Sequence, residues 1–297
     1  MYRSAFSAVA ALLAVSCSAQ SPSAIYDGGY NSTNATIELR IGNGGAGQSG
    51  LVGLLADEFI KDSVKNGSAP FLVAWYTSDT TYSIEHLSTG LLDVGITYSP
   101  AAEEIAVKQG IATDPVYYVF RDHFLFVGPS ANPANISAKD DIMTIFSDLH
   151  AAAESGVKTD PSVKFLSRYD KGYHQFIDFP IQALTAAILL EEYTITDRGT
   201  MLSLDAELAN RTVVYKAGSD DASDPLLNPA HLLVGVKAPN PDRAVAFAEW
   251  VISDRGQSVI AGFEKNGEKL YSPAPSNPSN SKLKGRSLKM PSYARLY

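Results

Sequence analysis

The stretch IELRIGNGGAGQSGLVGLLADEF, residues 37–59, joins a short β-rich run to a glycine-rich loop and then to an amphipathic helical pattern. Leu51, Leu55 and Phe59 recur at i, i+4 and i+8, which gives the predicted helix over 49–64 one apolar face. A helix of this kind directly after a strand packs on a sheet. The stretch therefore indicates an α/β fold.

The same alternation continues through most of the chain. The residues predict strands over 37–41, 71–76, 92–97, 163–167, 212–216 and 231–236, a long strand pair over 116–129, and helices over 81–89, 140–154, 178–191 and from Pro241 onward. Each buried parallel strand needs a crossover helix before the next strand, so this order is typical of parallel α/β layers. The chain is long enough for two medium lobes or one large domain.

Gly42, Gly44 and Gly47 have the G-x-G-x-x-G spacing of dinucleotide-binding loops. That fold also needs an acidic residue about 20 residues further on, to bond the ribose hydroxyl. Lys65 and Asn66 lie at that distance, so the dinucleotide interpretation fails. The glycines still let backbone N–H groups approach an anion closely at the start of a helix, which favours a small oxyanion. A glycine turn that only packs a helix against a strand is the alternative.

Three loops that follow predicted strands supply candidate ligands for an oxyanion. The glycine loop offers main-chain amides and neutral side-chain donors, WYTSDTTY at 75–82 offers hydroxyls, and FLSRYDKGYH at 165–174 offers a guanidinium. The predicted ligand-binding residues are Asn43, Gly44, Gly45, Ala46, Gln48, Ser49, Thr77, Ser78, Ser167 and Arg168. Helix capping by the hydroxyls, and a salt bridge from Arg168 to Asp170 or Asp178, are the alternatives.

The composition and the motifs of the chain argue against several classes of function. The net charge of −8 argues against nucleic acid or an anionic membrane as the partner. The five histidines show no H-x-x-x-H spacing, and the chain has no G-x-S-x-G elbow. The carboxylates of TDRG (196–199) and SDRG (253–256) are interpreted as helix caps followed by glycine turns. We therefore expect a binding protein that is not an enzyme and needs no cofactor.

The two ends of the chain differ from the α/β middle. Residues 1–19 have Arg3, a short apolar stretch and small residues before Gln20, the pattern of a secretory signal peptide. A bacterial lipoprotein box ending at Cys17 is the alternative. Residues 272–297 are rich in Ser, Pro and Asn and then basic, which predicts a disordered tail.

Cys17 is the only cysteine, so its removal with the signal would leave no thiol for a disulfide or a metal site. Five N-x-S/T sequons predict glycosylation at Asn31, Asn34, Asn66, Asn135 and Asn210. This number favours a secreted eukaryotic glycoprotein, with chance occurrence in a Ser/Thr-rich chain as the alternative.

Several segments together resemble the substrate-binding proteins of tungstate- and molybdate-type ABC transporters, in the version also found in secreted fungal proteins. They are SGLVGLLADEF (49–59), LLDVGITYSPAAEE (91–104), RDHFLFVGP (121–129), FLSRYDK (165–171), YTITDRGTMLSL (193–204), DPLLNP (224–229) and AFAEWVISDRGQSVIAGF (246–263). The resemblance implies a two-lobed type II periplasmic-binding-protein fold, in which each lobe is a small mixed sheet flanked by helices. The lobes are then expected over 37–120 with 231–271 and over 121–230, joined by strand crossings near 117–126 and 225–235.

The sequence departs from this family at two places. GNGGAG stands where bacterial members have a Thr/Ser-rich loop, so either backbone amides replace the hydroxyls or the ligand differs. The segment between SRYDK and YTITDRG is shorter than the family pattern, which indicates a reduced second lobe or an imperfect gene model.

The expected function is a secreted, monomeric solute-binding protein that traps a tungstate- or molybdate-like oxyanion in an interlobe cleft. A membrane transporter partner is left open. The alternative is a secreted interaction protein that kept the fold and lost anion binding.

Overall fold

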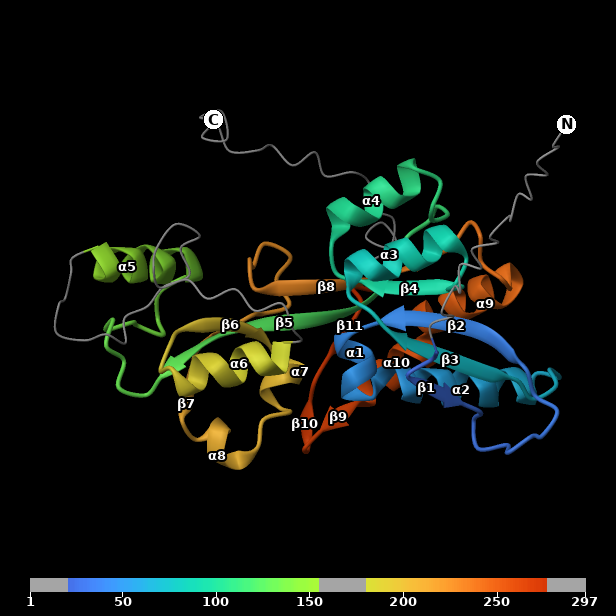
Figure 1. Cartoon of the computed structure of the whole chain (residues 1–297), viewed down its shortest axis with the longest axis horizontal. Helices are drawn as coiled ribbons and strands as arrows, with labels where there is room; N and C mark the ends of the chain where they lie inside the picture. The colour runs from blue at the N-terminus through green and yellow to red at the C-terminus, as the bar shows by residue number, and fades with distance from the viewer. Residues whose placement is uncertain (1–20, 155–179, 277–297) are drawn as a thin grey trace, which may run out of the picture.

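The computed structural model describes residues 21–154 and 180–276. Their main sheet has the strand order β1-β3-β2-β4-β8-β5-β11 (Figure 1). Strand β2 is parallel to β3 and β4, whereas β8 is antiparallel to both β4 and β5. The strands on this path are β1 Ala24–Tyr26, β2 Ile37–Asn43, β3 Leu72–Thr77, β4 Val94–Thr97, β8 Leu227–Val234, β5 Tyr117–Pro129 and β11 Ser272–Pro273.

Strand β5 carries the chain from one half of the molecule into the other. Its first half pairs with β8 as far as His123, and its second half, from Phe124 onward, pairs with β6 Thr194–Asp197 and β7 Thr212–Ala217. The predicted strand pair over 116–129 is therefore wrong, because this run is one long strand. Arg121 and Asp122 interrupt its apolar pattern, but both still pair with β8 and they do not turn the chain.

Helices cover both faces of each half. They are α1 Gly45–Ser49, α2 Leu51–Lys65, α3 Thr80–Thr89, α4 Pro100–Lys108, α5 Ile142–Glu154, α6 Pro180–Leu189, α7 Arg198–Met201, α8 Ala206–Ala209, α9 Pro241–Ile252 and α10 Asp254–Gly262. Helices α2, α9 and α10 lie on one face of the first half, and α3 and α4 lie on the other. In the second half, α5 and α6 cover opposite faces of β5. The expected two-lobed type II architecture is confirmed.

The largest core cluster is aromatic at its centre. The Phe59 ring packs edge-on against Phe247, with the ring centroids 5.2 Å apart, and also contacts Phe71 and Trp250. Such pairs add roughly 0.5–1.5 kcal/mol each beyond the area that they bury. The apolar face predicted for the first helix, which includes Phe59, therefore packs as expected.

The first helix begins differently from the prediction. The expected helix over 49–64 is split at Gly50, whose φ of 100° is left-handed and breaks the helix. Residues 45–49 of the glycine loop form the separate short helix α1. Pro241 does lie in the first turn of α9, as predicted, and the Asn240 side chain caps this helix.

Two smaller predictions are corrected. Asp197 and Ser253 do cap helices, but Gly199 and Gly256 lie inside α7 and α10 and form no turn after them. Ser272 and Pro273, placed by the sequence in a disordered tail, form β11 and pair with Arg121 and Phe120. The expected signal peptide and the tail beyond residue 276 lie outside the described residues. No helix in the described ranges is long and apolar enough to cross a membrane.

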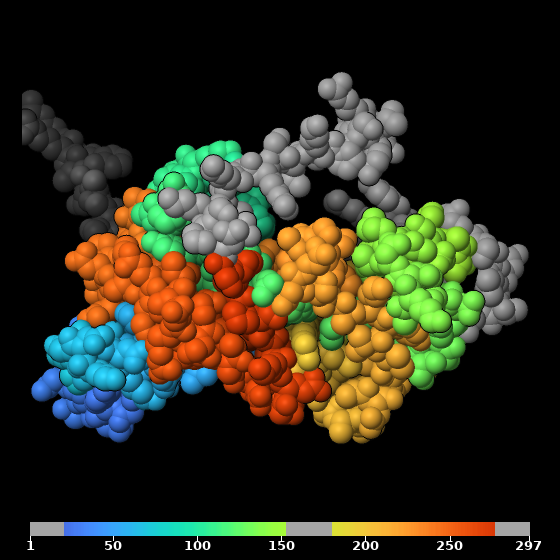
Figure 2. Space-filling model, turned by 180° about the vertical axis from the view of Figure 1, so that it is seen from behind, coloured from blue at the N-terminus to red at the C-terminus, as the bar shows by residue number. Residues whose placement is uncertain are grey.

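The C-terminal segment runs along the boundary between the halves. Figure 2 shows this red band between the orange helices of the first half and the amber surface of the second. It contains a hairpin, β9 Glu264–Lys265 and β10 Glu268–Lys269, and then β11. We call this boundary the seam, and it is where a ligand held by both lobes would lie.

Candidate functional site

Two short helices meet at the seam. Helix α1, from the glycine loop, lies against α7, which follows β6 of the second half. Polar side chains from five different segments surround this contact, and we call them the seam cluster. Its members are Asn43, Ser49, Tyr98, Asp122, Asp197 and Tyr271.

Asn43 fixes the shape of the glycine loop. Its side chain is fully buried, its Nδ2 donates to the Ile96 carbonyl at 2.9 Å, and its Oδ1 accepts the Gly47 N–H at 2.8 Å. The indole of Trp75 donates to the Asn43 carbonyl at 2.8 Å. The Asn43 side chain therefore holds the loop and has its own partners already.

The first amides of the loop have no partner within α1. The N–H groups that begin a helix have no carbonyl four residues earlier within it, so those of Gly45 and Ala46 have no acceptor inside α1, and the Ala46 N–H faces the Tyr98 hydroxyl. Gly45 and Gln48 are exposed, whereas Ala46 is buried. Because α1 has five residues, these donors act as individual N–H groups and gain little from a helix dipole.

The Tyr98 hydroxyl is a buried donor at the end of β4. Among the described residues it has no hydrogen-bond partner of normal geometry, although the Asn43 side chain and the Ala46 N–H face it. Burial, and then the charge of Asp122, raise the pKa of this hydroxyl far above its usual range. The group keeps its proton and can donate it in a hydrogen bond.

Tyr271 and Ser49 join the C-terminal segment to the glycine loop. Their hydroxyls lie 3.0 Å apart, and the Ser49 hydroxyl also donates to the Ala46 carbonyl at 2.9 Å. Burial, followed by the neighbouring Tyr98 and Asp122, raises the pKa of Tyr271 well above its ordinary value. The second phenol of the cluster therefore also stays neutral.

Asp122 brings a carboxyl into the seam cluster. It is 4% exposed, its Oδ1 accepts the His123 N–H at 2.7 Å, and it lies across from Asn228 on β8. Burial, and then repulsion from Asp197, raise the pKa of Asp122 to about 8. Asp197 is held by Thr200, whose N–H and hydroxyl donate to the two carboxylate oxygens at 2.8 and 2.5 Å.

The hydroxyls predicted from the second loop are turned to other partners. Thr77 donates to the Ser23 hydroxyl at 2.8 Å, and the hydroxyl of Ser78 lies 2.7 Å from that of Ser83. The cap of the next helix is Asp79, which accepts the Tyr82 N–H. The structure thus brings the predicted residues 43–49 together at the seam, with Ser78 behind them at the Gly44 backbone. Ser167 and Arg168 lie outside the described residues.

The sequence analysis did not identify four members of the cluster, namely Tyr98, Asp122, Asp197 and Tyr271. Asp122 did leave a signal, since it and Arg121 are charged residues inside the mostly apolar run over 116–129. Tyr98 and Tyr271 left no such signal in the sequence, because a partly buried tyrosine is common in any core.

The asparagines of the five sequons are all exposed. Asn66 and Asn210 follow α2 and α8 directly, and Asn31 and Asn135 have left-handed φ values of 51° in turns. Each therefore has the accessibility that a glycan requires.

No protein-family model matches the chain. Comparison with known proteins and solved structures does find relatives. The tungstate-binding protein TupA of Peptoclostridium acidaminophilum is 30% identical over 260 residues, which cover 76% of this chain and 81% of TupA. A solved structure described as "a periplasmic putative metal binding protein" is 53% identical, with a TM-score of 0.77, and covers 86% of this chain and all of that one. TupA of Desulfovibrio alaskensis G20 is 20% identical with a TM-score of 0.64, covers 81% of this chain and 99% of its own, and supports the fold alone.

Proposed function

Because this chain belongs to the family of tungstate-binding substrate-binding proteins of ABC transporters, we propose that it traps a small tetrahedral oxyanion, such as tungstate or molybdate, at the seam. The relatives named above are described as binding proteins, and the two TupA proteins among them bind tungstate by name, an oxyanion of the class that the site's chemistry favours. The identity of the anion within this class is part of the proposal.

The donors come mainly from the glycine loop. The N–H groups of Gly44, Gly45 and Ala46 bind the anion directly, and the side chains of Gln48 and Ser49 lie beside them. Asn43, Thr77 and Ser78 support the anion site without donating to the anion, because their side chains already hold the loop and its neighbours. Ser167 and Arg168 complete the proposed set from the second lobe.

One observation carries the proposal most directly. The Tyr98 hydroxyl is buried at the seam without a hydrogen-bond partner of normal geometry among the described residues, and it faces the Ala46 N–H. A buried donor left unpaired costs roughly 1–3 kcal/mol, which an anion accepting from both groups would recover.

Calorimetric titration with tungstate, molybdate, sulfate and phosphate tests the proposal. We expect tungstate and molybdate to bind, and Tyr98→Phe to weaken them about tenfold or more, since a hydrogen bond to a charged group contributes roughly 1.5–3 kcal/mol. Tyr215→Phe is the matched control, because the Tyr215 hydroxyl donates to the Pro129 carbonyl, away from the seam cluster. The absence of heat and of a thermal shift with all four anions would refute the proposal.

Arg168 supplies the full positive charge of the proposed site. Its replacement by alanine should weaken anion binding by about 1.5–3 kcal/mol. An unchanged affinity in this variant would place the charge that holds the anion elsewhere.

We also propose that the chain is a secreted, glycosylated, monomeric member of the family, of the kind expected from a fungus. The signal-like residues 1–19 and the five exposed sequon asparagines support this. A pull-down would test whether it delivers its anion to a membrane transporter. If no oxyanion binds, the remaining candidate is an interaction protein that kept the fold.

A further inference from the structure

Two carboxyls at the proposed anion site, the buried Asp122 and the partly exposed Asp197, require an explanation. The pairing partner of β5 changes between His123 and Phe124, and this change brings Asp122 and Asp197 together, since Asp197 pairs directly with Phe124. Ionised carboxylates beside a bound dianion would repel it, and they would do so strongly because water is excluded there. A site of this composition can therefore hold a dianion only if one of these charges is neutralised.

We infer, on the basis of the proposed function, that Asp122 is a proton-carrying member of the anion site. Its neutral carboxyl is compatible with a bound tetrahedral dianion, whereas its carboxylate is not. Anion binding is then coupled to the uptake of a proton whenever Asp122 starts ionised.

The surroundings of Asp122 identify it as the group that takes the proton. Asn228 on β8, the phenols of Tyr98 and Tyr271, and Asp197 with Arg198 at the end of β6 all face it. Arg198 is the cation in this set, and it is engaged by Glu268 at 3.1 Å and is partly exposed. Asp197 accepts two hydrogen bonds from Thr200, whereas burial and the neighbouring Asp197 raise the pKa of Asp122 to about 8, so Asp122 keeps its proton at neutral pH.

The coupling between proton binding and anion binding gives the size of the expected change in anion affinity with pH. If only the protonated form binds, the apparent dissociation constant rises as the protonated fraction falls, which amounts to about 30-fold between pH ~7 and pH ~9.5. A site built only from amides, hydroxyls and an arginine would show no such loss in this range, because none of those groups titrates there.

Calorimetric titration of the full chain with tungstate at pH 7, 8 and 9.5 tests the inference. For the unmodified protein we expect the roughly 30-fold loss of affinity, and for Asp122→Asn we expect a ratio near one between the same two pH values. Thermal unfolding of the variant shows whether it is folded. In parallel, titration of the unmodified protein at pH 9.5 in buffers of different ionisation enthalpy should show about one proton taken up per anion.

The outcomes separate this inference from the proposed function. No binding at pH 7 refutes the proposed function itself. Binding that is equally tight at pH 7 and 9.5, or that occurs without proton uptake, overturns the inference alone. A pH dependence that persists in Asp122→Asn also overturns it, because the proton then belongs to another group. If the variant does not fold, the proton count of the unmodified protein decides.

Discussion

Gly47 is required by its neighbour and not by its backbone angles. A Cβ at this position would lie 2.1 Å from Cε2 of the Trp75 indole, which packs directly on the glycine. We expect Gly47→Ala to destabilise the protein by about 2 kcal/mol through overpacking, and to change the tryptophan fluorescence as the indole moves. Urea unfolding followed by fluorescence measures both effects.

Gly45 provides the control two residues away in the same helix. An added Cβ there meets no atom of the described chain within 4 Å. Gly45→Ala should therefore leave the stability unchanged or raise it by up to about 1 kcal/mol, because alanine favours a helix. Equal destabilisation by the two substitutions would contradict the assignment of Trp75 as the cause.

Asp122 should also shape the stability of the free protein. Its folded pKa of about 8 lies above the value of about 3.9 for an unfolded aspartate, so between these values the native state binds the extra proton. Its contribution is then fully present below pH ~4 and is lost as the pH rises towards 8. Asp122→Asn should flatten this part of the profile of unfolding free energy against pH. A variant and parent with parallel profiles from pH 5 to 8 would show that Asp122 is ionised in the folded protein.

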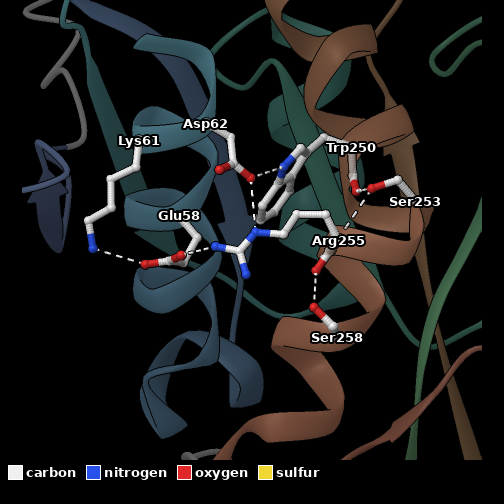
Figure 3. Close-up of polar contacts among 8 residues, drawn as sticks. Glu58, Lys61, Asp62, Trp250, Ser253, Arg255 and Ser258 are labelled. Carbon is white, nitrogen blue, oxygen red and sulfur yellow. Dashed lines mark hydrogen bonds and ion pairs between the residues drawn. The ribbon is translucent and has the colours of Figure 1, made fainter. Parts of the chain in front are cut away.

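The elements of the first lobe are tied together by a surface cluster (Figure 3). Asp62 on α2 accepts from the Trp250 indole at 2.9 Å and from Arg255 Nε at 3.1 Å, and Arg255 also pairs with Glu58. Because Arg255 is about half exposed, we expect the Asp62–Arg255 coupling in a double-mutant cycle to be only about 0.5–1 kcal/mol.

Salt distinguishes the two bonds to Asp62. The coupling to Arg255 should weaken in about 1 M salt, whereas the indole bond should not, because only the first is an ion pair. Lys108→Ala is the control, since Lys108 pairs with Glu104 on its own helix α4, outside this cluster. A coupling energy that does not change with salt would contradict an ionic origin.

Helices α1 and α2 show how much of the secondary structure the local sequence pattern can predict. Helical periodicity correctly predicted the apolar face of α2, because Leu51, Leu55 and Phe59 all pack on the core. It could not predict α1, since glycine-rich segments are poor helix formers. This helix exists because the buried Asn43 side chain holds the Gly47 N–H and the Trp75 indole covers Gly47, and both contacts are tertiary.

The candidate site was predictable to a similar extent. The glycine loop is recognisable in the sequence, so this half of the candidate site could be predicted, and it stays a prediction. The proximity of Asp122 to Asp197 depends on the register of β5 against β6, in which residues about 70 positions apart become neighbours. No local pattern encodes that register, so the acidic pair emerges only from the folded chain.

At the scale of the whole molecule, the β9–β10 hairpin connects the two halves at the seam. Its turn is formed by Asn266 and Gly267, with φ values of 55° and 78°, the geometry of a tight two-residue turn. The hairpin reaches α7 and the turn after it through three polar contacts. They are Lys265 Nζ to the Ser203 hydroxyl at 2.7 Å, Asn266 Nδ2 to the Leu202 carbonyl at 2.8 Å, and Glu268 to Arg198 at 3.1 Å.

These contacts should slow the opening of the seam and therefore the release of a bound anion. The double substitution Lys265→Met with Glu268→Gln removes two of them and keeps the turn residues. Exposed polar contacts contribute up to about 1 kcal/mol each, so we expect tungstate to dissociate about 3- to 10-fold faster with little change in its association rate. Stopped-flow fluorescence can follow this, because Trp75 donates to the carbonyl of Asn43 in the glycine loop.

The control for this variant removes a salt bridge of the same kind that does not cross the seam. Glu104→Gln breaks the exposed Lys108–Glu104 pair within α4 and should leave the dissociation rate unchanged. In about 1 M salt, the Arg198–Glu268 part of the effect should shrink, because exposed charges are then screened over a few ångströms. If the hairpin variant releases tungstate at the parental rate, the lobes open without breaking these contacts, and closure of the seam then depends on the α1–α7 contact and the Ser49–Tyr271 bond.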